Sequence, residues 1–310
     1  MIEEVPSITK VVPRHPDASL GARELFMFHL RRLPIVKPMN LVIIGSGNLA
    51  HALGSRWLHS ERIATLSILA RSQKFLSQNW DADLQSRVTY DPKILSTAHL
   101  IVLAVKPKDA STALHQVAEH ASDSAVVLSV IAGISIAQMR SVLPKSGIIR
   151  TMPNICSEIG RSVTGYSVNG VLPVDREYAC QVLGELGDAV ETPESWLDPM
   201  TALFGSGPAY VLEFIGNIIN TAVTLGLDSD IARQLALRMV VGTSELALTE
   251  PALALGDLQS RVVSPGGTTE AMLHVLHTSR WPDIMESALK AAGSRAVQLG
   301  REAAAAVKPQ

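Results

Sequence analysis

The sequence has few cysteines and few aromatic residues, and each shortage excludes a class of protein. Two cysteines among 310 residues cannot build the disulfide framework of a small secreted domain, and they fit a reducing compartment. Aromatic residues make up 4% of the chain, so a platform for stacking nucleic-acid bases is not expected. The formal net charge of -2 also lacks the basic excess that attracts nucleic acids.

Long apolar runs and metal-binding patterns are missing as well. Hydrophobic residues make up 47% of the chain, but no uninterrupted apolar run approaches the roughly 20 residues that a membrane span needs. Among the histidines, His274 and His277 stand three residues apart on an expected helix with no third ligand in view, so no metal site is expected. We therefore expect a soluble, cytoplasmic protein that binds no metal, membrane or nucleic acid.

The first 38 residues differ in composition from the rest of the chain. They contain several prolines and mixed charges, and they lack both a sustained hydrophobic period and the apolar segment of a secretory signal. Residues 1–38 are therefore expected to form a loosely ordered extension that is dispensable for chemistry. The folded part is expected to begin at Met39.

A glycine-rich loop follows the first apolar run. Gly45, Gly47 and Ala50 form a Gly-x-Gly-x-x-Ala pattern between a strand-like segment, 41–44, and a segment with helical spacing. In that context one glycine permits a tight turn, the next lets the backbone approach a pyrophosphate, and a small third residue lets helix and strand pack closely. The loop therefore predicts a dinucleotide site, whose expected contacts here are Gly45, Gly47, Asn48 and Leu49.

Strand-like and helical segments alternate over residues 39–195, which predicts an α/β domain with a parallel sheet covered on both faces. Ligands of such sheets bind at the carboxyl ends of the strands, where 70–72, 104–107 and 132–133 are expected to meet the glycine loop. The expected strands are Leu41–Gly45, Thr65–Ala70, Leu100–Val105, Ala125–Ile131 and Gly147–Met152. The expected helices include Ala50–His59, Ala110–His120 and Ile136–Val142.

Residues 196–310 have few strand signals and are expected to form an all-α domain. The segment Ala209–Thr224 is apolar nearly all round, and such a helix needs deeper burial than one small helical domain provides. We therefore expect a homodimer with interleaved C-terminal helices. Asp230 and Ser264 stand where helix caps or turns begin. The expected helices are Pro208–Leu225, Asp230–Leu248, Thr268–His277 and Pro282–Ala306.

A second glycine-containing turn, Ser264-Pro265-Gly266-Gly267-Thr268-Thr269, directly precedes one of these helices. Backbone N–H groups turned inward at a helix N-terminus, together with the helix dipole, favour an anion. The alternative is an ordinary helix entry with capping hydroxyls. The first glycine loop, at the other end of the chain, favours the anion-binding interpretation.

The motifs together resemble the pyrroline-5-carboxylate reductase family over residues 39–300. The resemblance implies a Rossmann-type dinucleotide-binding domain and a C-terminal all-α dimerisation domain, assembled as a dimer or a larger ring. It implies NAD(P)H-dependent reduction of the cyclic imine 1-pyrroline-5-carboxylate to L-proline in proline biosynthesis. The matching segments are 44–50, Leu103-Ala104-Val105-Lys106-Pro107, Ala132-Gly133-Ile134-Ser135, Arg150-Thr151-Met152-Pro153-Asn154, Gly205-Ser206-Gly207-Pro208-Ala209-Tyr210 and 264–269.

The resemblance also implies roles for particular residues. Thr269 would hydrogen-bond the ring nitrogen of the substrate, and Lys106 and Asn154 would lie near the nicotinamide or the substrate. Cofactor contacts are further implied for Ala104, Val105, Lys106 and Pro107. The substrate would be bound by Ser264, Gly266, Gly267, Thr268 and Thr269, with Glu250 as a further candidate.

The residues after the second expected strand predict NADPH as the cofactor, with NADH as the alternative. No acidic residue directly follows that strand to bind a ribose 2′-hydroxyl. Instead Arg71, Ser72 and Lys74 offer the donors and positive charge that a 2′-phosphate needs. The alternative is that these side chains are simply solvated.

Three departures from the family pattern keep the substrate open. Ile155 and Cys156 replace a usual Thr-Pro, Ser260 replaces a usual acid, and Glu270 replaces a usually apolar residue. At a helix N-terminus an acid is favoured by the dipole, but in the pocket Glu270 would repel a carboxylate or attract a basic group. The alternative functions are reduction of a related cyclic imino acid and a non-catalytic nucleotide-binding regulator.

Overall fold

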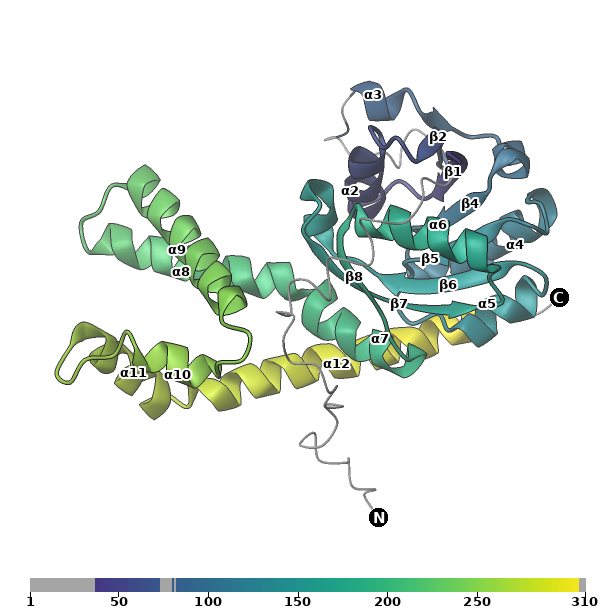
Figure 1. The fold of residues 1–310 in the computed structure, drawn as a ribbon. Coiled ribbons are helices and arrows are strands. Elements are labelled where there is room, and N and C mark those ends of the chain that lie inside the picture. Colours follow the sequence, from purple (N-terminus) through teal and green to yellow (C-terminus); the bar gives the residue numbers. More distant parts are fainter. Residues whose placement is uncertain (1–36, 73–79, 81, 307–310) are drawn as a thin grey trace, which may run out of the picture.

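The computed structural model describes residues 37–72, 80 and 82–306 (Figure 1). The expected N-terminal extension lies almost entirely outside these residues, and so does Lys74. The first strand begins at Met39, two residues before its predicted start at Leu41, and ends at Ile44. The strands are β1 (Met39–Ile44), β2 (Ile63–Leu69), β3 (Val88–Thr89), β4 (Leu100–Leu103), β5 (Val126–Ser129), β6 (Gly147–Met152), β7 (Ser162–Asn169) and β8 (Gly187–Glu191).

All eight strands form one sheet in the order β3-β2-β1-β4-β5-β6-β7-β8. The prediction of a parallel sheet is correct up to β6 and wrong at β7, which pairs antiparallel with β6. Only short segments connect β6 to β7, through the 3-10 helix η4 (Ile155–Ile159), and a parallel crossover needs a longer connection. Strands β3, β7 and β8 were not predicted, because β3 has two residues and β7 mixes polar with apolar side chains.

Helices cover both faces of the sheet. The apolar run of β1 is continuous because Leu41 and Ile43 pack into one core cluster and Val42 and Ile44 into the other. Helices α4 and α5 agree with the predicted bounds, whereas α6 was not predicted. The helices and 3-10 helices of this domain are α2 (Asn48–Trp57), α3 (Ala82–Gln85), η2 (Pro92–Thr97), η3 (Pro107–Asp109), α4 (Ala110–His120), α5 (Ile136–Val142) and α6 (Pro173–Gly184).

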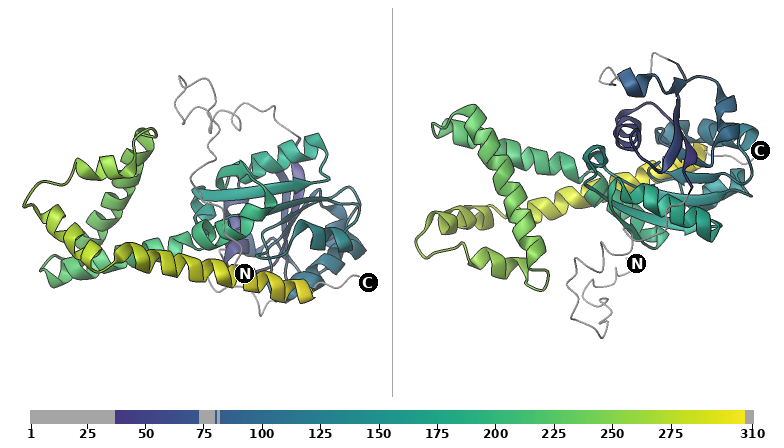
Figure 2. Two further views of the ribbon diagram at one scale, coloured as in Figure 1. Left: turned by 90° about the horizontal axis from the view of Figure 1, so that it is seen from below. Right: turned by 45° about the horizontal axis from the view of Figure 1, so that its top comes forward.

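The C-terminal helices form an arm that extends away from the sheet (Figures 1 and 2). The long last helix runs from the arm back to the sheet domain. The short helix α10 was not predicted. The elements are α7 (Glu194–Met200), the π-helical turn η5 (Thr201–Gly205), α8 (Gly207–Thr224), α9 (Ser229–Thr249), α10 (Leu255–Ser260), α11 (Thr268–Thr278) and α12 (Trp281–Ala306).

The expected cap of α9 is wrong by two residues. Asp228 is the N-cap, and its Oδ1 accepts hydrogen bonds from the N–H groups of Asp230 (2.9 Å) and Ile231 (3.1 Å). Asp230 therefore lies in the first turn of the helix. Ser264 begins a turn, since its carbonyl accepts from the Gly267 N–H at 2.9 Å, but the N-cap of α11 is Gly267.

A buried arginine joins the sheet to the first helix of the arm. Arg150 of β6 is 5% exposed, and its guanidinium pairs with Glu194 at 3.2 Å and with Asp198, both on α7. The same Glu194 carboxylate accepts from the Ile136 N–H at 2.7 Å. The charge of Arg150 is therefore compensated, and α7 is held against two elements of the sheet domain.

The arm leaves many apolar side chains exposed. Of the residues of α8, only Gly207 and Ile215 are buried. The segment Glu194–Thr224 is long and apolar enough to cross a membrane by length and composition, and 17% of its most apolar 18-residue stretch is buried. It is interrupted by Pro199 and by the π-helical turn η5. Its exposed faces suit contact with a second protein chain.

Candidate active site

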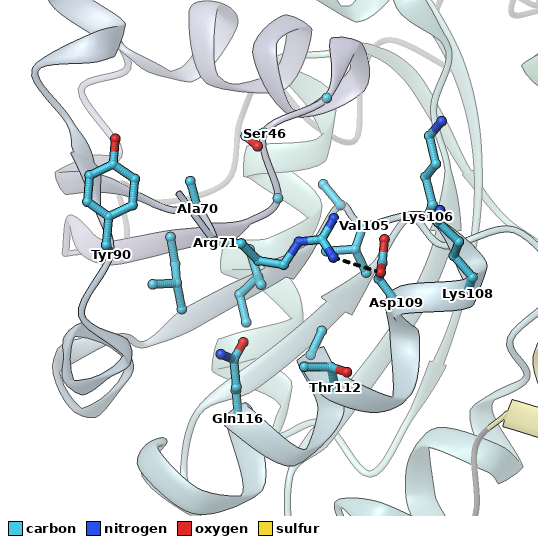
Figure 3. Close-up of a pocket in the computed structure, with 16 residues that line it drawn as sticks. Ser46, Ala70, Arg71, Tyr90, Val105, Lys106, Lys108, Asp109, Thr112 and Gln116 are labelled. Carbon is cyan, nitrogen blue, oxygen red and sulfur yellow. Dashed lines mark hydrogen bonds and ion pairs between the residues drawn. The ribbon is translucent and has the colours of Figure 1, made fainter. Parts of the chain in front are cut away.

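A cavity of about 500 Å³ opens at the carboxyl ends of β1, β2 and β4, next to the start of α4. Figure 3 shows its lining side chains. This is the edge where an open α/β sheet binds its ligands. The position therefore agrees with the expectation from the glycine loop.

Glycine suits the two loop positions, 45 and 47, for different structural reasons. Gly45 has φ +130°, and a Cβ there would lie 2.3 Å from the carbonyl oxygen of Ala104, so a side chain is excluded by the end of β4. Gly47, the N-cap of α2, has an extended backbone, and no described atom lies within 4 Å of a Cβ built there. Gly47 therefore leaves open space at a helix N-terminus, which is where a pyrophosphate binds.

The structure brings most of the expected cofactor residues to this cavity. Asn48, Leu49, Ser72 and Pro107 are not part of its lining, and their cofactor contacts remain predictions. Among the lining residues not expected, Lys108 and Asp109 could have been found by extending the strand-end argument by two residues. The expected residues in the lining are Gly45, Gly47, Arg71, Ala104, Val105 and Lys106. The lining residues that were not expected include Ser46, Tyr90, Lys108, Asp109, Thr112 and Gln116.

Charge in the cavity is mostly positive. Arg71, Lys106 and Lys108 contribute cations, and the described lining adds one carboxylate, that of Asp109. The Arg71 Nη1 lies 3.1 Å from the Asp109 Oδ1. Lys106 is the N-cap of η3 and its side chain is exposed. The cavity thus suits a ligand with several negative charges.

Asn154 is held by structural hydrogen bonds in the single chain. Its side-chain oxygen accepts from the Cys156 N–H at 2.9 Å, and its amide nitrogen donates to the Phe204 carbonyl at 3.0 Å. It is buried and is not part of the cavity lining. A proline at position 156, as in the family pattern, could not donate the first of these bonds. The expected contact of Asn154 with nicotinamide or substrate remains a prediction.

The Ser264–Thr269 loop contains a glycine in the left-handed backbone conformation, and the N–H of that glycine already donates a hydrogen bond. Gly266 has φ +71°, a conformation that L side chains rarely adopt. Its N–H donates to the Glu270 Oε2 at 2.7 Å. Glu270 thus places a carboxylate on the backbone that was expected to bind an anion. Thr268 and Thr269 begin α11.

Glu250 is engaged by a neighbouring arginine. Its Oε1 lies 3.1 Å from the Arg261 Nη1, and both side chains are about half exposed. Ser260, at the position where the family usually has an acid, donates instead to the Asp257 carbonyl at 2.7 Å. The expected role of Glu250 in substrate binding therefore remains a prediction.

One chain does not bring Thr269 to the cavity. Figures 1 and 2 show α10 and α11, and so the loop between them, in the part of the arm away from the sheet domain. The cavity lies within that sheet domain, and its described lining contains no residue of the arm. The two glycine motifs thus lie far apart in a single protomer.

Among the described residues, neither a metal-binding cluster nor an activated Cys180 thiol is present. In that part of the chain no three His, Cys, Asp or Glu residues gather as a metal site. Burial raises the pKa of the Cys180 thiol, which donates to the Tyr166 hydroxyl at 3.3 Å. A buried thiol with a raised pKa is a poor nucleophile.

The fold and the cavity define a dinucleotide-binding α/β protein with a helical arm. Family models agree with both parts. Residues 40–133 match the family described as NADP oxidoreductase, coenzyme F420-dependent, and residues 194–299 match pyrroline-5-carboxylate reductase dimerisation. The second match supports an oligomer formed through the arm.

Individual relatives cover almost the whole folded part. A pyrroline-5-carboxylate reductase of Synechocystis is 32% identical over 267 residues, which are 85% of this chain and 99% of the relative. One from Staphylococcus saprophyticus is 29% identical over 269 residues, again 85% and 99%. The chain therefore belongs to the pyrroline-5-carboxylate reductase family, as its motifs predicted.

Solved structures agree with this assignment. The crystal structure of Plasmodium falciparum pyrroline carboxylate reductase with NADP bound has a TM-score of 0.78 and 25% identity, covering 86% of this chain and 99% of that one. A pyrroline-5-carboxylate reductase from Coxiella burnetii has a TM-score of 0.71 and 27% identity, covering 85% and 99%.

Proposed function

We propose that this protein reduces 1-pyrroline-5-carboxylate to L-proline with NADPH, as a cytoplasmic enzyme of proline biosynthesis. The observation that carries the proposal is the pair of glycine motifs on two connected domains. One lies at a cation-lined cavity, and the other provides backbone donors and threonine hydroxyls for a small carboxylate. The relatives that match nearly the full length of the folded chain are named for this activity.

The cofactor fits the cavity by shape and by charge. The open space at Gly47 admits a pyrophosphate at the N-terminus of α2. Arg71 lies at the end of β2, where the adenosine ribose binds in this fold, and supplies donors for a 2′-phosphate. The bound cofactor supplies the hydride.

The reaction needs positioning more than acid–base chemistry. Hydride adds to the carbon of the protonated C=N bond, whose electrons become the nitrogen lone pair, so the ring nitrogen already carries the proton that the amine keeps. The Thr269 hydroxyl would hydrogen-bond that nitrogen. The N–H groups at the start of α11 would hold the substrate carboxylate, and the Gly266 N–H would join them only when it is released by Glu270. These contacts fix the imine carbon against the nicotinamide.

A second protomer is needed to complete this site. Because the loop of one chain lies away from its own cavity, we infer that the arm of one protomer brings Thr269 to the cavity of its partner. The exposed apolar faces of α8 and α9, which include Leu212, Phe214 and Leu235, provide the surface for pairing. The homodimer is the unit that the site requires, and a ring of dimers is the alternative assembly.

Glu270 favours a second candidate, reduction of a related cyclic imino acid. Its carboxylate on the Gly266 N–H disfavours a substrate carboxylate and favours an imine with a basic group. The third possibility, a non-catalytic nucleotide-binding regulator, predicts no turnover.

Steady-state oxidation of NADPH with a panel of cyclic imines separates these functions. The proposal expects the highest kcat/KM with 1-pyrroline-5-carboxylate. A higher value with a piperideine carboxylate or a cationic pyrroline would support the second candidate instead. Binding of NADPH without turnover of any imine would support the regulator and overturn the enzyme.

A further inference from the structure

The Arg71–Asp109 ion pair spans the cofactor cavity. Arg71 follows β2 and Asp109 ends η3, which follows β4, while β1 lies between those strands in the sheet. The 3.1 Å pair therefore crosses the carboxyl end of β1, where the glycine loop begins. Figure 3 shows the Arg71 side chain stretched across the cavity toward Asp109, between Ser46 and Thr112.

The Asp109 carboxylate is not used as a helix cap. Asp109 is the N-cap of α4, but its side chain makes no capping hydrogen bond, although aspartate at this position normally accepts from the next turn. Its backbone N–H is fixed to the Lys106 carbonyl at 2.8 Å. The side chain of Asp109 is 22% exposed and that of Arg71 57%. Asp109 is thus the more buried partner of the pair, with its backbone fixed.

We propose that Asp109 is a specificity-determining residue that competes with the 2′-phosphate of NADPH for the Arg71 guanidinium. The proposal rests on the proposed use of NADPH. A 2′-phosphate at the end of β2 needs the Arg71 donors that Asp109 now accepts from. The 2′-hydroxyl of NADH carries no charge and leaves the ion pair intact. Asp109 therefore weakens binding of NADPH more than binding of NADH.

Two other roles for Asp109 predict different results. An ordinary exposed ion pair contributes little, and its loss would change the affinity for neither cofactor. A carboxylate that holds Arg71 in the correct position for the phosphate would, when removed, weaken NADPH binding. The competitive role alone predicts tighter NADPH binding after the charge of Asp109 is removed.

The test is direct binding, with no imine present. The dissociation constants of NADPH and NADH are measured by cofactor fluorescence for the full chain, for Asp109→Asn and for Asp109→Ser, which keeps a good N-cap residue for α4. We expect both variants to bind NADPH about three- to tenfold more tightly, because the Arg71 guanidinium is released to the 2′-phosphate, with less than about a twofold change for NADH. The dissociation constants of adenosine 2′,5′-bisphosphate and AMP are measured for the same three proteins. These two ligands differ only in the 2′-phosphate, so the ratio of their constants reports the contribution of that group.

Two controls define the mechanism. Asp123→Asn removes an exposed carboxylate that pairs with Lys145 at 2.7 Å and lies outside the cavity lining, so it should change neither constant. In an Arg71→Gln background the gain from Asp109→Asn should fall to less than about twofold, because no guanidinium remains to be released.

Equal changes for both cofactors, or weaker NADPH binding in both Asp109 variants, would overturn the proposal. So would an undiminished gain in the Arg71→Gln background. Failure of the proposed reaction is a separate result, because it would appear in imine turnover and leave these binding constants unaffected.

Discussion

The Glu270 carboxylate of α11 accepts a hydrogen bond from the Gly266 N–H at 2.7 Å. An acid near a helix N-terminus is stabilised by the dipole, and here it also satisfies a backbone donor of the loop. Any substrate carboxylate that binds this loop meets the charge of Glu270. The residue therefore links the stability of the loop to its affinity for anions.

Replacing Glu270 should separate these two effects. Glu270→Gln keeps the size of the side chain and removes its charge. We expect KM to fall about three- to tenfold for pyrroline-5-carboxylate and to fall less, or not at all, for 1-pyrroline, since only the first carries a carboxylate that the Glu270 charge repels. The thermal unfolding of the variant should show a loss of about 0.3–1 kcal/mol. An unchanged ratio of the two KM values would show that Glu270 serves only the helix.

Thr269→Ala should lower kcat more than it weakens NADPH binding. A hydrogen bond that strengthens as the ring nitrogen becomes an amine acts mainly on the transition state. At about 0.5–1.5 kcal/mol, or more when charge-assisted, the loss is about 3- to 100-fold. Thr278→Ala is the matched control, since its hydroxyl only bonds carbonyls of the same helix. Full activity of Thr269→Ala on every imine would refute its assigned role.

Gly266→Val should weaken substrate binding rather than cofactor binding. The left-handed backbone of Gly266, with φ +71°, is strained for a β-branched residue by about 1–3 kcal/mol. The loop would then lose the inward orientation of its N–H groups. We expect a higher KM for the imine and an unchanged Kd for NADPH, measured by fluorescence. Gly256→Ala, in α10 with open space around it, is the control.

Gly133→Ala should loosen the contact between the sheet domain and the last helix. Gly133 has φ +76°, and a Cβ there would lie 2.3 Å from the Gly300 Cα of α12. Because the Gly300 Cα is a backbone atom and no side chain can turn aside, the helix must move. We expect a loss of about 1–3 kcal/mol in the free energy of unfolding, measured in urea. Gly256→Ala, at a helical glycine with open space around it, is the control and should cause no loss. If Gly133→Ala also caused no loss, α12 would not be fixed at this point.

The sequence predicted those parts of the fold whose signals are local. Strand β6 and helices α4 and α5 have the predicted bounds, because each is a regular apolar segment with clear ends. Strands β7 and β8 were missed because each mixes polar with apolar side chains and has no continuous apolar run. The sequence predicted that the segments after β2 and β4 meet at the glycine loop, but it did not predict the Arg71–Asp109 pair, since the pairing of particular side chains depends on the conformations of the two loops. The separation of Thr269 from the cavity likewise depends on the direction of the arm.

Mixing two impaired variants should raise the activity above their sum if the site is shared between protomers. Gly47→Asp places a carboxylate in open space where the pyrophosphate is expected, so the variant should fold without binding NADPH. Thr269→Ala retains the cofactor site and lacks the hydroxyl of the arm. In a mixed dimer, one of the two sites combines an intact cavity with an intact loop from the other chain.

The expected recovery follows from the symmetry of the dimer. After equal amounts of the two variants are unfolded and refolded together, about half of the dimers are mixed and each has one intact site, so about one quarter of the wild-type activity should return. The control is the same mixture combined without unfolding, which should show only the summed activity of the two variants until subunits exchange. If each site were built within one protomer, refolding would restore nothing, and the arm would have to fold back onto its own sheet domain.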